Sequence, residues 1–85
     1  MRDEQNLTEE VRSTMADVFG LDEPDLPANP SQTSLAAWTS LKHMLLMVGL
    51  EEHFGVELSM EEMLAMKSQS DIVRILQSRA TATAV

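Results

Sequence analysis

The stretch WTSLKHMLLMVGLEEHFG, residues 38–55, decides the fold of this chain. Small, turn-forming residues precede it, and apolar residues then recur at the spacing of a helix. Thr39 or Ser40 can accept hydrogen bonds from the first unpaired N–H groups, and Gly55 can adopt the left-handed conformation that ends a helix. The stretch therefore predicts a helix over about residues 41–54.

The apolar residues of this helix fall on two sides when successive residues are placed about 100° apart. One side carries Leu41, Met44, Leu45 and Val48. The other side carries Leu46, Met47, Leu50 and Phe54. A surface helix of a bundle needs a single apolar stripe, and a helix buried on all sides is hard to arrange in 85 residues. We expect the second set to face the core and Leu41 to lie at its boundary, while the rest of the first set forms a partly exposed strip for a partner.

The chain before this stretch predicts one helix and one long loop. The helix has an apolar stripe at spacings of four, four and three, formed by Leu7, Val11, Met15 and Val18. Asn6 and Glu9 fit a capping box at its start, and Gly20 fits its end. The loop, residues 20–37, holds all three prolines, and we expect apolar side chains to attach it to the core. These side chains are Leu21, Leu26 and Leu35.

Two further helices follow. Ser59 and Glu62 fit a second capping box, which opens a short helix, and Ser70 starts the last helix. The short helix is expected to turn Met60, Met63 and Leu64 inward, and the last helix has Ile72, Ile75, Leu76 and Arg79 at helical spacing. We therefore predict an all-α fold, a small four-helix bundle of three longer helices and one short third helix, with a long loop between helices 1 and 2. Residues 1–5 and 80–85 are expected to be frayed.

The composition limits the classes of function. Six Lys and Arg against fourteen Asp and Glu give a net charge of −8, which repels nucleic acid and anionic lipid and attracts a basic protein partner. The same acidity also keeps a small domain soluble. The chain has no cysteine, so disulfides and thiolate metal sites are excluded, and no metal site is expected. No apolar run reaches the ~18 residues of a membrane span, and the polar N-terminus is unlike a signal peptide. We expect a monomeric cytoplasmic protein that neither binds nucleic acid nor inserts into a membrane.

Two motifs stand at a fixed distance in the central helix. Thr-Ser-Leu occupies residues 39–41, Leu-Glu-Glu-His-Phe-Gly occupies residues 50–55, and the step from the serine to the phenylalanine is fourteen residues. Acyl and peptidyl carrier proteins have Asp-Ser-Leu and Leu-Glu-Glu-x-Phe-Gly at the same distance. Val-Glu-Leu-Ser, residues 56–59, is similar to the link that leads to their short third helix. The segment of residues 38–75 therefore resembles this family, which is a four-helix bundle with a long first loop.

The resemblance implies a single carrier domain, residues 1–85, that is not an enzyme. A phosphopantetheinyl transferase would attach 4′-phosphopantetheine covalently to Ser40, and the thiol of this cofactor would hold an acyl or aminoacyl group as a thioester. The partners would be that transferase, an acyl- or aminoacyl-activating ligase, and a downstream synthase or transferase. The residues expected to take part in partner recognition are Thr39, Leu41, Met44, Leu45, Val48, Glu51 and Glu52. The two glutamates would form an acidic rim for a basic partner.

Thr39 departs from the aspartate of the family. A threonine still caps the helix, but a negative charge is missing where transferases of this family dock. Lys42 and His43 should make this end of the helix more basic still. The departure indicates a dedicated or broadly specific transferase and a specialised polyketide, nonribosomal peptide or lipid pathway. The short flanking segments lead us to expect a free-standing protein.

Three alternatives stay open at this point. Ser40 could be a helix cap only. It could instead be a nucleophile with His43, one turn on, as its base, although the sequence offers no acid to orient the pair. The chain could also be an unmodified helical adaptor that binds a partner through Met44, Leu45 and Val48.

Trp38, His53 and the methionines of this region are expected to have structural rather than chemical roles. We expect Trp38 to be an apolar plug that attaches the loop to the core, with positioning of the prosthetic arm as a secondary role. His53 is expected to be a solvated residue at the helix end. The methionines at positions 44, 47, 60, 63 and 66 are expected to form adaptable core.

Overall fold

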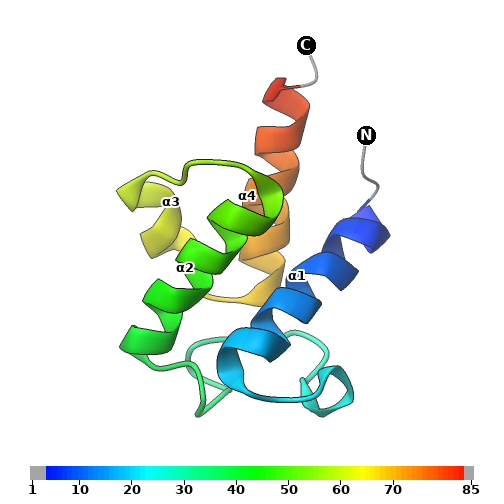
Figure 1. The fold of residues 1–85 in the computed structure, drawn as a ribbon, viewed down its shortest axis with the longest axis vertical. Coiled ribbons are helices and arrows are strands. Elements are labelled where there is room, and N and C mark those ends of the chain that lie inside the picture. The colour runs from blue at the N-terminus through cyan, green and yellow to red at the C-terminus, as the bar shows by residue number, and fades with distance from the viewer. Residues whose placement is uncertain (1–3, 84–85) are drawn as a thin grey trace.

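The computed structural model describes residues 4–83 as an all-α bundle of four helices, which confirms the predicted fold class (Figure 1). The elements are α1 (Glu4–Phe19), the 3-10 turn η1 (Glu23–Asp25), α2 (Ser40–Phe54), α3 (Met60–Ala65) and α4 (Gln69–Thr83). The long loop crosses the end of the bundle at which α1 ends and α2 begins (Figure 1). None of the helices in the described part of the chain combines the length and the hydropathy that a membrane span requires.

α1 carries the apolar stripe that its spacing predicts. Three of the four residues are buried and the fourth is partly buried, namely Leu7, Val11, Met15 and Val18. The predicted capping box at Asn6 and Glu9 is wrong, because the helix begins at Glu4 and both residues lie within it. The two residues directly before Asn6 are Glu4 and Gln5, which both favour a helix and extend it towards the N-terminus. Gly20 ends the helix as predicted, at a φ of 71° that favours glycine.

α2 packs against α1 and turns one of its two apolar sides into the core. Leu46, Met47 and Leu50 are buried, and Phe54 is partly buried against them. On the other side Met44, Leu45 and Val48 are exposed, as the two-sided pattern predicts. Leu41, expected at the boundary of the core, is also exposed. The first turn of α2 lies outside the core, and the first buried residue of the helix is Leu46. Gly55 ends the helix in the left-handed conformation, as predicted.

The loop between α1 and α2 is attached to the core by its leucines. Leu26 is buried, and Leu21 and Leu35 are partly buried against the core, which confirms the predicted attachment. The sequence pattern did not indicate the short turn η1, which forms around Pro24. The loop is therefore an ordered part of the bundle rather than a loose connection.

Arg12 of α1 joins three parts of the fold. Its guanidinium donates hydrogen bonds to the carbonyls of Leu26 and Pro27 at 3.0 and 2.7 Å and to Gln69 Oε1 at 2.7 Å. Gln69, a buried polar residue at the start of α4, also donates to the Ala28 carbonyl at 3.3 Å. One cation thus connects α1, the loop and α4, and nothing in the spacing of the sequence indicates this contact.

α3 has the predicted cap but not the predicted orientation. The Ser59 hydroxyl accepts a hydrogen bond from Glu62 N–H at 3.1 Å, and the Glu62 carboxylate accepts one from Ser59 N–H at 2.9 Å. Met60 and Leu64, predicted to face inward, are 71% and 65% exposed, whereas Met63 packs partly against the core. Met63 lies at one edge of the arc that the three residues share, and the helix contacts the core along that edge.

α4 begins at Gln69, one residue before the predicted start. Ile72 and Leu76 are buried and Ile75 is partly buried, in agreement with the helical spacing. The predicted frayed ends overlap the helices at residues 4–5 and 80–83. The remaining positions of those ends, 1–3 and 84–85, lie outside the described residues.

Candidate functional site

Ser40 is the first residue of α2, and the helix does not need its side chain as a cap. The N-cap is Thr39, whose Oγ1 accepts a hydrogen bond from Lys42 N–H at 3.2 Å. Ser40 is exposed, and its hydroxyl forms no hydrogen bond with any residue that the structure describes. The alternative that Ser40 is only a cap is therefore wrong, and its hydroxyl is available for chemistry.

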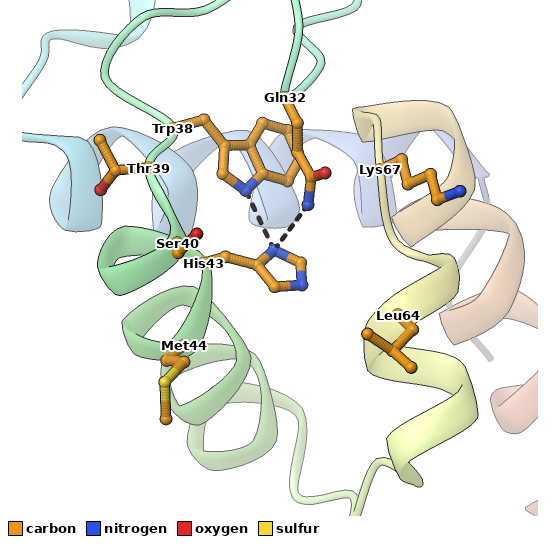
Figure 2. Close-up of a pocket in the computed structure, with 8 residues that line it drawn as sticks. All are labelled: Gln32, Trp38, Thr39, Ser40, His43, Met44, Leu64 and Lys67. Carbon is orange, nitrogen blue, oxygen red and sulfur yellow. Dashed lines mark hydrogen bonds between the residues drawn. The ribbon is translucent and has the colours of Figure 1, made fainter.

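A groove of about 640 Å³ lies beside Ser40, between α2 and α3 (Figure 2). Its lining residues come from both helices, from the loop and from the link after α3, namely Gln32, Trp38, Thr39, Ser40, His43, Met44, Leu64 and Lys67. Figure 2 shows His43 reaching from α2 into the groove, with Leu64 and Lys67 on the opposite wall. The groove thus combines apolar contacts with hydrogen-bonding groups next to an accessible hydroxyl.

Trp38 attaches the end of the loop to the core. It is 4% exposed, and the centre of its ring lies 5.5 Å from that of Phe19. The His43 ring lies beside the indole, with 6.0 Å between the ring centres and 26° between the ring planes. This packing confirms the predicted apolar plug and fixes the chain immediately before Thr39.

His43 uses both of its ring nitrogens inside the protein. Trp38 Nε1–H lies 3.0 Å from Nδ1, and an indole N–H can only donate, so Nδ1 is the acceptor. Nε2 lies 2.9 Å from the Met63 carbonyl, which can only accept, so Nε2 carries the proton. The imidazole is therefore neutral and has no lone pair left for the Ser40 proton. This arrangement contradicts the alternative in which Ser40 is a nucleophile with His43 as its base.

The two basic residues at the start of α2 differ in what they contribute. Lys42 Nζ donates to the Val18 carbonyl at 3.1 Å and so caps the carboxyl end of α1. His43 is neutral in the arrangement above. The positive charge of Lys42 therefore stays near the start of α2, as expected, whereas His43 adds no charge in this arrangement.

Six large apolar side chains are exposed on α2 and α3, and we call them the α2–α3 face. They are Leu41, Met44, Leu45, Val48, Met60 and Leu64. Met44 and Leu64 line the same groove, so the exposed residues of the two helices adjoin each other beside Ser40. Sequence reasoning missed the contribution of α3, because a six-residue helix does not reveal by its pattern which side it turns inward.

The glutamates at the end of α2 differ in their surroundings. Glu51 is partly buried, and its Oε2 accepts a hydrogen bond from Leu58 N–H at 2.8 Å, which ties the link after α2 to the helix. Glu52 is exposed, and so is Glu61 on α3. Of the two glutamates expected at an acidic rim, Glu52 is thus the one whose carboxylate is open to a partner.

His53 is exposed at the end of α2, as the sequence predicted, but it also has a partner on α1. Its Nε2 lies 3.0 Å from Glu10 Oε1 of α1, and its ring meets the edge of Phe54. The side chain therefore links α2 to α1. The sequence did not indicate this contact, because Glu10 is 43 residues away along the chain and only the packing of the two helices brings it near.

The carboxylate of Glu62 lies among groups that favour its charged form. The backbone hydrogen bond from Ser59 lowers the pKa of Glu62 below its ordinary value of 4.5, although partial burial opposes the shift. Attraction to Arg79 of α4, 3.0 Å from the carboxylate, acts in the same direction as the hydrogen bond. Glu62 thus stays ionised at neutral pH and attaches the start of α3 to α4.

The residues at the start of α2 fit a covalently attached phosphate. The first-turn N–H groups of a helix have no acceptor within the helix, and the helix dipole is positive at this end. Ser40 offers an exposed hydroxyl there, and no carboxylate stands among the residues that line the adjoining groove. A phosphodiester on this hydroxyl would meet favourable dipoles and no like charge from the groove.

This bundle, with an accessible serine opening its second helix, has the architecture of a carrier domain. The family model described as "Phosphopantetheine attachment site" matches residues 9–76, which extend from α1 into α4. The chain belongs to this family, and its cofactor is covalently attached 4′-phosphopantetheine. A comparison with curated proteins gave no significant match.

Proposed function

We propose that Ser40 carries the phosphopantetheine and that the protein holds an acyl or aminoacyl group on it for biosynthetic enzymes. The observation that supports this assignment best is the division of labour at the start of α2. Thr39 caps the helix, while the exposed Ser40 hydroxyl points out beside a groove. A serine in this position can be modified at little cost in stability, because no contact has to be broken.

The chain contributes position and electrostatics, and the cofactor contributes the reactive group. The chain has no cysteine, so the thiol that forms the thioester belongs to the phosphopantetheine. The start of α2 favours the negative charge of the phosphate through its unpaired N–H groups and its dipole. Trp38 and the capped first turn keep the attachment point rigid. In this proposal the domain is a carrier and catalyses no reaction itself.

The α2–α3 face is proposed as the docking surface for a phosphopantetheinyl transferase, an activating ligase and a downstream synthase or transferase. Its apolar side chains adjoin Ser40, where an enzyme that acts on the arm must bind. Glu52 and Glu61 are exposed on the same two helices and would attract a basic rim on the partner. Thr39 replaces the aspartate of the family, and this difference supports a specialised polyketide, nonribosomal peptide or lipid pathway. We propose the cytoplasm as its location. We propose that the protein works as a monomer.

The assignment of Ser40 is tested by intact mass after incubation with coenzyme A and a broadly specific phosphopantetheinyl transferase. We expect the wild-type protein to gain one phosphopantetheine, Thr39→Ala to gain one as well, and Ser40→Ala to gain none. The Thr39→Ala variant controls for the loss of a neighbouring hydroxyl. Addition to Ser40→Ala would overturn the assignment of the residue.

A second candidate is an unmodified adaptor that binds a partner through Met44, Leu45 and Val48. The observation in its favour is the exposure of all three side chains on one side of α2. The same mass measurement separates the two proposals, because an adaptor would remain at its original mass with every transferase tried. We favour the carrier because the chain belongs to a family defined by phosphopantetheine attachment.

A further inference from the structure

We propose that His43 is a positioning residue that holds α3 across the groove from Ser40. The imidazole extends from α2 and hydrogen-bonds with the end of the loop (Figure 2). Its other nitrogen contacts the Met63 carbonyl near the carboxyl end of α3. The consequence for function rests on the proposed role of the α2–α3 face, whereas the structural part can be tested on the protein without cofactor.

Trp38 fixes the direction of the imidazole. Its indole N–H is a donor only, which leaves Nδ1 unprotonated and places the single proton on Nε2. Gln32 Nε2 lies 3.3 Å from the same Nδ1 and adds a second donor on that side. With Nδ1 held by the loop, the Nε2–H is aimed at the Met63 carbonyl, 2.9 Å away. The loop therefore sets the tautomer, and the tautomer provides the donor that α3 needs.

α3 depends on such contacts because it is short and little buried. It has six residues, and none of them is buried. The Met63 carbonyl is one of the last four of the helix, which have no N–H partner in a regular turn, and the following Met66 N–H lies 3.4 Å from it. His43 supplies the closer donor at this end, and at the other end Glu62 pairs with Arg79 at 3.0 Å. Polar contacts to α2 and α4 thus attach both ends of α3.

The position of α3 decides the shape of the docking surface. Met60 and Leu64 complete the α2–α3 face, and Leu64 forms the wall of the groove opposite His43. If α3 moves, these side chains move away from Met44 while the attachment serine stays in place. Loss of the His43 contact should therefore affect enzymes that recognise both helices more than it affects the bundle.

Two substitutions separate the contacts of His43. His43→Phe keeps a planar ring but removes both hydrogen bonds, whereas His43→Gln places an amide N–H near the position of Nε2 and can still donate to the Met63 carbonyl. We expect amide hydrogen exchange in residues 60–66 to rise about two- to tenfold in His43→Phe, in line with one lost hydrogen bond, and to stay near wild type in His43→Gln. The amides of α1 and α4 should keep their rates in both variants. If His43→Phe fails to fold, His43→Asn takes its place, because an asparagine can accept from Trp38 but does not reach Met63.

Nitrogen NMR of the imidazole gives a direct readout. We expect a neutral ring in the wild-type protein with the proton on Nε2, and a population of the Nδ1–H tautomer once Trp38→Phe removes the indole donor. The proposal is overturned if the wild-type proton sits on Nδ1. It is also overturned if exchange in residues 60–66 is the same in the wild-type, Phe and Gln proteins, or if α4 is loosened as much as α3.

The functional part is measured as the rate of phosphopantetheine transfer from coenzyme A. We expect every His43 variant to be modified to completion, with a slower rate for His43→Phe and a rate near wild type for His43→Gln. Equal rates for the two variants would overturn the link between His43 and docking. If the wild-type protein itself is not modified, the proposed function fails, and the exchange and NMR results still decide whether His43 holds α3.

Discussion

Thr39 Oγ1 accepts a hydrogen bond from Lys42 N–H at 3.2 Å, so the residue before Ser40, and not Ser40 itself, caps α2. The two neighbouring hydroxyls therefore have different tasks. Both residues are exposed beside the groove, but the Thr39 hydroxyl stabilises the helix, whereas the Ser40 hydroxyl takes no part in the cap. This separation should allow Ser40 to be altered without loss of the fold.

The first prediction compares the two hydroxyls in their effect on stability. Thr39→Ala should lower the free energy of unfolding by about 0.5–2 kcal/mol, because the first turn of α2 loses its cap. Ser40→Ala should change it by less than about 0.5 kcal/mol, as is usual for an exposed side chain without contacts. Urea unfolding followed by helical circular dichroism measures both values. A larger loss for Ser40→Ala would mean that the serine is the working cap.

The second prediction concerns the missing carboxylate at Thr39. Thr39→Asp should speed modification by a transferase of the fatty acid synthase type, since it returns a negative charge to the docking point. The fold should be unaffected because aspartate also caps well. Transfer rates measured at low and high salt should show an advantage for the variant that shrinks as salt rises. Equal rates for both proteins at low salt would show that this residue does not govern the choice of transferase.

The third prediction contrasts two adjacent leucines of α2. Leu45 is 47% exposed and Leu46 is fully buried. Leu45→Glu should leave the free energy of unfolding within about 0.5 kcal/mol of wild type, whereas Leu46→Glu should unfold the domain by burying an unpaired charge. Leu45→Glu should nevertheless slow acyl loading of the modified protein by its activating ligase, because charge at the centre of an interface is poorly tolerated.

Thermal melts and loading rates check this contrast. The assignment of Leu45 to the docking surface fails if its glutamate variant melts as early as that of Leu46. It fails equally if the loading rate does not respond to Leu45→Glu.

The fourth prediction follows from the lowered pKa of Glu62. A carboxylate whose pKa is lower in the folded than in the unfolded state stabilises the fold at any pH above the unfolded pKa, which is about 4.5 for a glutamate. This stabilisation is lost as the pH falls from the unfolded pKa through the lower folded pKa. Glu62→Gln keeps a capping side chain but removes the charge, so its stability should fall less than that of wild type when the pH drops below about 4.5.

Glu61→Gln is the matched control for this experiment, since Glu61 is an exposed neighbour on the same helix. Urea unfolding at pH 7 and at pH 3 to 4 should give a flatter pH dependence for Glu62→Gln than for Glu61→Gln. The same slope in both variants would count against a special role of Glu62.

The fifth prediction concerns Arg12, which holds the loop and α4 together. Arg12→Met keeps the stem but removes the hydrogen bonds to Leu26, Pro27 and Gln69, and should cost at least about 1.5–3 kcal/mol, the range for one hydrogen bond to a charged group. The free energy of unfolding of Arg12→Lys should lie between those of Arg12→Met and wild type. An ammonium can donate some of these hydrogen bonds but cannot reproduce the planar fork of donors of a guanidinium. Chemical unfolding measures the difference, and a melt of Arg12→Met that matches wild type would refute this role.

The sequence by itself determined the features that depend on neighbours three or four residues apart. A cap at Thr39 or Ser40, the capping box at Ser59 and the glycine ends at Gly20 and Gly55 could all be predicted locally, and the structure then assigned the first cap to Thr39. The two-sided pattern of α2 also separated buried Leu46 from exposed Leu45, because burial on a helix follows its period. The motifs of α2 further indicated the carrier family to which the chain belongs.

Only the tertiary structure decided which side α3 turns outward and which polar side chains meet. His43 reaches Met63, Lys42 reaches Val18, and His53 reaches Glu10, across sequence separations of 20, 24 and 43 residues. Such contacts depend on how the helices cross and on the space left between them, and a helical pattern does not contain this information. A short helix such as α3 has too few residues to fix its own orientation, so its neighbours on α2 and α4 set it.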